Sequence, residues 1–152
     1  MTLQRAQEID LQIVDYAFGG RGIARLETDK GPFVIFVDNT FPGQFVRAKI
    51  ETKRKTFAEA KLLEVLKRAD IETVSEFQEI SGGPYIHVPV STQEQYKKES
   101  TLSTFTRLSG IQDSSDKFDG FISSPAHYHY RNKMEYSFSC IEHDLQTNEE
   151  LD

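Results

Sequence analysis

Apolar and polar residues alternate over the first seventy positions in short runs that are rich in valine, isoleucine and phenylalanine. Glycine, proline, asparagine and aspartate separate the runs, a pattern typical of β-strands joined by turns. Five strands at this spacing predict a small closed barrel, because a lone open sheet of this size would expose its edges. The last run also has the alanine, leucine, glutamate and lysine content of a helix, but we favour a strand. The runs occupy residues 11–16, 22–26, 33–37, 44–51 and 57–66.

The pattern changes after residue 68. Residues 69–81 show no strong period and indicate a linker, whereas Leu102, Phe105 and Leu108 recur at helical spacing. We expect a helix over residues 91–108, capped by Ser91 or Thr92 and ended by Ser109-Gly110.

Two extended segments, at residues 120–124 and 130–141, complete the predicted elements. The second has no evident partner strand, so we expect an α+β domain that is incomplete here and continues in a longer protein. The chain is thus divided into a barrel at residues 1–68, a linker at 69–90 and a partial α+β region at 91–152.

Charge is unevenly distributed along the 152 residues, whose formal net charge is −6. Residues 1–68 contain twelve Lys and Arg against nine acids, and residues 69–152 contain six against fifteen. The overall charge argues against nucleic-acid binding, but the basic first half reverses that argument. The asymmetry suggests two modules with different roles, although an ordinary solvated acidic surface also explains the second half.

Composition restricts the other classes. No apolar run is long enough to span a bilayer, and the first ten residues lack the order of a secretory signal, so we expect a soluble, cytoplasmic protein, most simply a monomer. Cys140 is the single cysteine, which excludes an internal disulfide and favours a buried structural thiol. We expect no metal at His87 or at the pair His127 and His129, because a third ligand is missing.

The segment Phe18-Gly19-Gly20-Arg21-Gly22 is a glycine-rich turn between two predicted strands. It is not a dinucleotide fingerprint, because that motif needs a following helix. Two interpretations remain open. The glycines serve a tight turn, or they let an RNA phosphate approach while Arg21 supplies the charge.

Two other segments combine cations with aromatic rings. The first is Lys53-Arg54-Lys55 with Phe57, where the cations suit phosphates and the ring suits an unpaired base; a solvated hairpin tip is equally compatible. The second is Tyr130-Arg131-Asn132-Lys133 at the start of an apolar strand. Both segments are candidate RNA contacts.

These motifs resemble known families. Residues 7–66 resemble the TRAM domain, a small OB-like barrel appended to RNA-modifying enzymes, through the glycine turn, Pro42-Gly43 and the segment Lys53 to Phe57. Ser124-Pro125 followed by Tyr130 to Lys133 resembles a signature of the RNA uracil-C5 methyltransferases. The resemblance implies an RNA-binding part of an enzyme that moves a methyl group from S-adenosylmethionine to a uridine in ribosomal or transfer RNA.

The sequence also departs from that family. Ser75, Ser81 and Pro84 stand where the family has three cysteines for an iron-sulfur cluster, so we predict no cluster. The family's cysteine nucleophile, acidic base and S-adenosylmethionine motifs do not occur in these 152 residues, and the segment alone is expected to be inactive. The alternatives are a stand-alone RNA-binding module and a protein-interaction scaffold.

Overall fold

The computed structural model describes residues 3–28, 31–73, 85–111 and 115–127. The chain divides into two compact units, Met1–Phe121 and Ile122–Asp152. In the second unit only residues 122–127 are described; they are exposed and contain no helix or strand. The first unit contains a six-stranded sheet and a long helix, which agrees with the expected small β domain followed by a partial α+β part.

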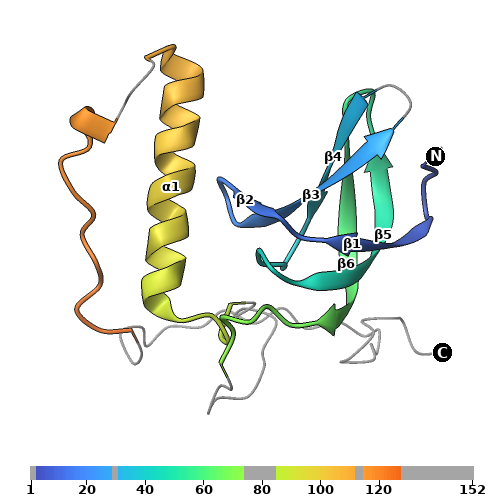
Figure 1. Ribbon diagram of the computed structural model, residues 1–152, viewed down its shortest axis with the longest axis horizontal. Helices are drawn as coiled ribbons and strands as arrows, with labels where there is room; N and C mark the ends of the chain where they lie inside the picture. The colour runs from blue at the N-terminus through green and yellow to red at the C-terminus, as the bar shows by residue number, and fades with distance from the viewer. Residues whose placement is uncertain (1–2, 29–30, 74–84, 112–114, 128–152) are drawn as a thin grey trace, which may run out of the picture. The chain divides into compact units, whose positions relative to one another are not determined.

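The sheet has the strand order β1-β5-β6-β4-β3-β2 (Figure 1). Only β4 and β6 pair in parallel, and every other neighbouring pair in this sheet is antiparallel. The strands are β1 (Glu8–Gln12), β2 (Asp15–Ala17), β3 (Arg21–Thr28), β4 (Gly31–Val37), β5 (Phe45–Lys53) and β6 (Phe57–Lys67).

The two strands at the ends of this order are neighbours in sequence. Only Ile13 and Val14 separate β1 from β2; the Ile13 amide donates to the Gln44 carbonyl at 2.9 Å, and the Val14 amide donates to the Ile23 carbonyl at 2.8 Å. One continuous segment therefore hydrogen-bonds to β5 at its start and to β3 at its end, which closes the sheet. Counted as one strand, it restores the five strands of the prediction, with the first one split at residues 13–14.

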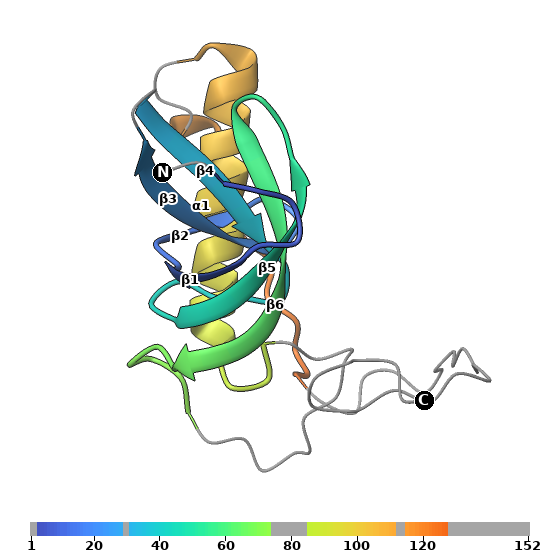
Figure 2. The same ribbon diagram turned by 90° about the vertical axis from the view of Figure 1, so that its right-hand side faces the viewer.

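The sheet is curved (Figures 1 and 2), and the core is formed by the buried apolar side chains of its strands. Inward positions alternate with outward ones, and small residues such as Ala58 and Ala60 are buried where β6 runs between its two neighbours. This alternation confirms the strand prediction for residues 57–66, because a helix would bury positions three or four apart. The fully buried apolar side chains include Leu11, Ile13, Ile35, Val37, Val46, Ala48, Ile50 and Ala58.

The predicted helix is α1 (Val90–Ser109), and it ends as expected at Gly110, whose φ of 71° is left-handed. The predicted cap is wrong: neither Ser91 nor Thr92 caps the helix, because Pro89 occupies the N-cap position without a side-chain hydrogen bond. Gln93 instead reaches back, and its Nε2 donates to the carbonyls of Val88 at 2.9 Å and Tyr85 at 3.1 Å.

Helix α1 is largely exposed, and Thr92 is its single buried residue. Leu102 is half-buried, whereas Phe105 and Leu108 are 46% and 78% exposed. The short helix η1 (Ser115–Lys117) follows, and the Lys98 ammonium lies 5.2 Å from the ring centre of Phe118 beside it. Within the described residues, no helix is long and apolar enough to cross a membrane.

Candidate nucleic-acid interface

The outer face of the barrel carries an unusual set of apolar side chains. On β3, β4 and β6 the residues that alternate with the buried ones include Ile23, Arg25, Val34, Phe36 and Phe57. The ion pair of Arg21 and Glu59 lies on the same face. Ile23 lies opposite Phe36, and Val34 lies between Arg25 and Phe57. An outward aromatic and aliphatic strip beside a cation is suited to stacking and phosphate contact, since every nucleobase offers an apolar face.

Phe57 was predicted to stack on a base. Its ring packs edge-on against Phe36, with centroids 5.8 Å apart and planes at 77°, and both rings are half-buried. The two rings extend the outward strip from β4 to the start of β6. The predicted residue Phe57 thus belongs to a surface that also includes Phe36.

The basic triplet lies at the β5–β6 connection, and all three of its side chains are exposed. The Arg54 amide donates to the Phe57 carbonyl at 2.8 Å, which closes the hairpin. Lys53 Nζ donates to the Leu3 carbonyl at 2.7 Å and is therefore held by the backbone. Within the described part of the chain, the Arg54 and Lys55 side chains form no ion pair, so both cations are available to a phosphate.

Arg21 differs from these two residues. Its guanidinium lies 3.1 Å from Asp38 and 2.9 Å from Glu59, so two carboxylates already face it. The Glu59 hydrogen bond, followed by the charge of Asp38, raises the pKa of Arg21 above its ordinary value. An RNA phosphate would compete with both partners at this position. The role of Arg21 as a phosphate contact stays a prediction.

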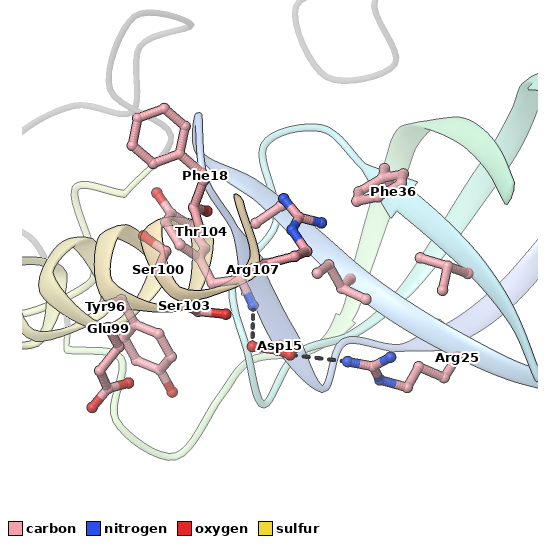
Figure 3. A pocket seen from close by; sticks show the side chains of 14 residues that line it. Asp15, Phe18, Arg25, Phe36, Tyr96, Glu99, Ser100, Ser103, Thr104 and Arg107 are labelled. Atoms are coloured by element: carbon pink, nitrogen blue, oxygen red, sulfur yellow. Dashed lines mark hydrogen bonds and ion pairs between the residues drawn. The ribbon is translucent and has the colours of Figure 1, made fainter. Parts of the chain in front are cut away.

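A cleft of about 560 Å³ lies between α1 and the outer face of β2, β3 and β4 (Figure 3). Its strand side carries Phe36 and Arg25, and the Arg25 Nη2 lies 3.1 Å from Asp15 Oδ2. Figure 3 shows Phe18 next to the helix at this cleft, and Arg107, a residue of the helix itself, also lines it. The helix side adds the hydroxyl groups of Ser100, Ser103 and Thr104.

Close packing inside the protein explains the glycines at positions 20 and 22 of the turn. A Cβ on Gly20 would lie 3.3 Å from the hydroxyls of both Tyr16 and Tyr85, and the Tyr85 hydroxyl donates to the Gly20 carbonyl. A Cβ on Gly22 would collide with Thr40. Gly19 is open to solvent at a φ of 96°, so it alone in this turn leaves room for the close approach of a ligand.

Four predicted contacts, Tyr130, Arg131, Asn132 and Lys133, lie outside the described residues, as do Cys140 and the positions Ser75, Ser81 and Pro84. His87 Nδ1 lies 3.0 Å from the Thr73 carbonyl oxygen. The described residues contain no group of three or more His, Cys, Asp or Glu that could hold a metal ion.

Sequence reasoning missed Phe18, Arg25, Phe36 and Arg107. A signal existed for Phe18, because an aromatic residue directly before two turn glycines has no core position to fill. Residues 33–37 are apolar throughout, and this hid the outward direction of Phe36.

Comparisons with known proteins show which families this chain resembles. Residues 3–63 match the TRAM domain. An uncharacterized RNA methyltransferase of Clostridium tetani is 32% identical over 99% of this chain and 31% of its own length. One of Clostridium acetobutylicum is 26% identical over 89% of this chain and 29% of its own length.

One solved structure is also similar in sequence. It is the solution structure of a conserved protein of Methanococcus maripaludis, 32% identical over 41% of this chain and 83% of that chain, with a TM-score of 0.36. The chain spans less than a third of the length of the two RNA methyltransferases. The chain thus matches the TRAM domain at residues 3–63, and nearly its whole length resembles the N-terminal part of the RNA methyltransferase family.

Proposed function

We propose that this chain is the RNA-binding portion of an RNA uracil-C5 methyltransferase, and that it binds RNA on the β5–β6 hairpin and the outer face of β3, β4 and β6. The observation that carries the proposal is the placement of Phe36 and Phe57 on that face, next to the exposed cations Arg54 and Lys55. Rings that stack on unpaired bases, together with cations that meet phosphates, form the usual surface for single-stranded RNA.

The similarity supports the same reading. Relatives over 88–99% of the chain are named RNA methyltransferases, and TRAM domains accompany RNA-modifying enzymes. Methyl transfer would use S-adenosylmethionine as the donor and a uridine of ribosomal or transfer RNA as the acceptor. The described residues contain no glycine-rich turn that leads from a strand into a helix, so we assign none of them to the methyl donor. Catalysis would reside in the part of the intact enzyme that this chain does not include.

The test is binding of a fluorescent RNA with a uridine-rich loop across a series of salt concentrations. We compare the wild type with Arg54→Ala/Lys55→Ala and with the control Arg5→Ala/Lys67→Ala, which removes two exposed cations from other parts of the barrel. If both hairpin cations contact single-stranded RNA, the slope of log K against log salt falls by about 1.4 in the first variant only. Equal losses in both variants would indicate a general charge effect and would contradict the assigned surface.

Enzyme activity has its own test. The intact protein should transfer a labelled methyl group from S-adenosylmethionine to ribosomal or transfer RNA transcripts, and the 152-residue chain alone should transfer none. Absence of RNA binding at low salt would favour the scaffold interpretation. Methyl transfer by the short chain would refute the assignment of catalysis to the missing part.

A further inference from the structure

Phe18 is the most exposed aromatic side chain described in the barrel. It lies at the end of β2, at the turn into β3, and is 67% exposed. This ring lines the 560 Å³ cleft and also a second cleft of about 330 Å³, whose lining includes Gly19 and Gly20 of the turn. A large apolar ring that projects between two clefts is available to a ligand that enters both.

The larger cleft has the chemistry of a base-binding site. Ile23, Val34 and Phe36 supply an apolar wall, and Arg25 and Arg107 supply cations. Its volume lies within the range of about 300–1,000 Å³ that small-molecule sites occupy. The hydroxyls of Ser103 and Thr104 can donate to and accept from base edges, and Ser100 Oγ, which donates to the Lys97 carbonyl at 3.1 Å, can accept.

Two carboxylates also line the larger cleft, and both have partners. Asp15 accepts a hydrogen bond from Arg25 at 3.1 Å, and Glu99 accepts one from Gln95 at 2.9 Å. The Arg25 guanidinium partly offsets the charge of Asp15, which reduces repulsion of an RNA strand there, whereas the neutral Gln95 amide leaves the charge of Glu99 in place.

The smaller cleft has the chemistry of a phosphate-binding site. It is lined by Gly19, Gly20 and Lys97, together with the hydroxyl-bearing residues Ser100 and Thr101. Lys97 is exposed, and within the described residues its ammonium has no ion-pair partner. The open space beside Gly19 lets a phosphate come close to the backbone.

We propose that the β2–β3 turn and α1 together hold one unpaired nucleotide of RNA, with its base stacked on Phe18 in the larger cleft and its phosphate at Lys97 in the smaller one. This inference rests on the proposed RNA-binding function and adds a second, single-strand-specific contact separate from the β5–β6 hairpin. Stacking accepts any base but requires that the base be unpaired, so the site selects loops and bulges over duplex.

The test uses a short single-stranded RNA that carries one fluorescent 2-aminopurine, whose emission falls when the base stacks. Phe18→Leu removes the aromatic face and keeps an apolar side chain, whereas Phe18→Tyr retains the ring. Lys97→Ala is matched by Lys98→Ala, because the Lys98 ammonium lies over Phe118 and lines neither cleft. All three positions are exposed, so the four variants should fold, and far-UV circular dichroism checks this.

We expect Phe18→Leu to bind about 10-fold more weakly and to lose the quenching, with Phe18→Tyr close to the wild type. Lys97→Ala should reduce the salt slope by about 0.7, and Lys98→Ala should leave it unchanged. In a duplex of the same sequence the 2-aminopurine is already stacked on its neighbours, so its emission should not fall further when the protein is added.

Quenching that persists in Phe18→Leu, or equal effects of the two lysine variants, would overturn the nucleotide site even if the hairpin variants still weaken RNA binding. If the wild type itself bound no RNA, that result would instead contradict the proposed function on which this inference rests.

Discussion

The rings of Phe41 and Tyr96 pack edge to face, with centroids 5.0 Å apart and planes at 74°. Phe41 belongs to the buried connection between β4 and β5, and Tyr96 belongs to α1. Tyr16 and Tyr85 complete a cluster of four aromatic rings. In the pairs that contact each other, the ring centroids are 5.0–6.1 Å apart. Because Tyr96 is also part of the cleft wall, this cluster determines how the helix faces the outer strands.

Replacing Tyr96 with alanine should loosen α1 from the barrel. The variant loses edge-to-face contacts with Phe41 and Tyr16, each worth about 0.5–1.5 kcal/mol beyond burial, so we expect a loss of about 1–2 kcal/mol. Amide hydrogen exchange should accelerate along residues 90–109 more than in β3 to β6. Tyr96→Phe keeps the ring and serves as the control. Unchanged exchange in the alanine variant would show that the ring cluster does not hold the helix.

Gly22→Ala should destabilise the barrel by about 1–3 kcal/mol, because overpacking forces neighbouring atoms to move. The new methyl group would collide with the Thr40 side chain and lie 2.8 Å from Ile13 Cγ2, and both of these residues are buried. Gly120→Ala is the matched control, since nothing lies within 4 Å of its added Cβ. Chemical denaturation measures both; equal midpoints would contradict the tight packing at Gly22.

The strands could be predicted because the alternation of apolar and polar residues follows directly from burial on one face. The split of the first strand at residues 13–14 could not. It arises because the same segment pairs with β5 on one side and β3 on the other, a tertiary relationship that leaves no local pattern. The N-cap of α1 was missed because the helix starts earlier than predicted. The amides of Thr92 and Gln93 already donate to the Pro89 carbonyl, so Ser91 and Thr92 lie inside the helix.

Part of the candidate interface was also predictable. Lys53, Arg54 and Lys55 could be named as candidates because a run of cations beside an aromatic residue is visible in sequence, and their contact with RNA stays a prediction. The contribution of Lys97 and Arg107 was not visible, because it depends on α1 lying beside β2 and β3 after the chain has left the barrel. Long-range packing, rather than residue type, brings these cations to the clefts.

Stability should fall at alkaline pH through Tyr85. Burial, reinforced by a hydrogen bond with Tyr16, raises the pKa of Tyr85 above its ordinary value of 10.0. The folded state then holds the phenol proton more tightly than the unfolded state. The contribution of the Tyr85 phenol to the free energy of unfolding is therefore complete below about pH 10. It is lost as the pH rises toward the folded-state pKa.

Urea denaturation of the wild type and Tyr85→Phe between pH 8 and pH 12 measures this effect. Tyr96, whose pKa burial also raises, is present in both proteins and cancels in the difference. We expect the free energy of unfolding of the wild type to fall relative to that of Tyr85→Phe above about pH 10. A difference that stays constant over the whole range would mean that the Tyr85 proton is held no more tightly in the folded state.

Arg21 and Arg25 lie on the same outward face of β3 and should differ in their effect on RNA affinity. Arg21 is held by Asp38 and Glu59, whereas Arg25 has Asp15 as its partner and lines the larger cleft.

We expect Arg21→Gln to change the RNA dissociation constant by less than about 2-fold, because two carboxylates already neutralise its charge. Arg25→Gln should weaken binding about 5-fold and lower the salt slope, as expected for a lost phosphate contact. All three ion pairs are exposed, so neither change should alter the free energy of unfolding by more than about 1 kcal/mol. A larger loss of affinity in Arg21→Gln than in Arg25→Gln would restore the phosphate contact predicted from the glycine turn and would move the RNA path from the cleft toward Asp38 and Glu59.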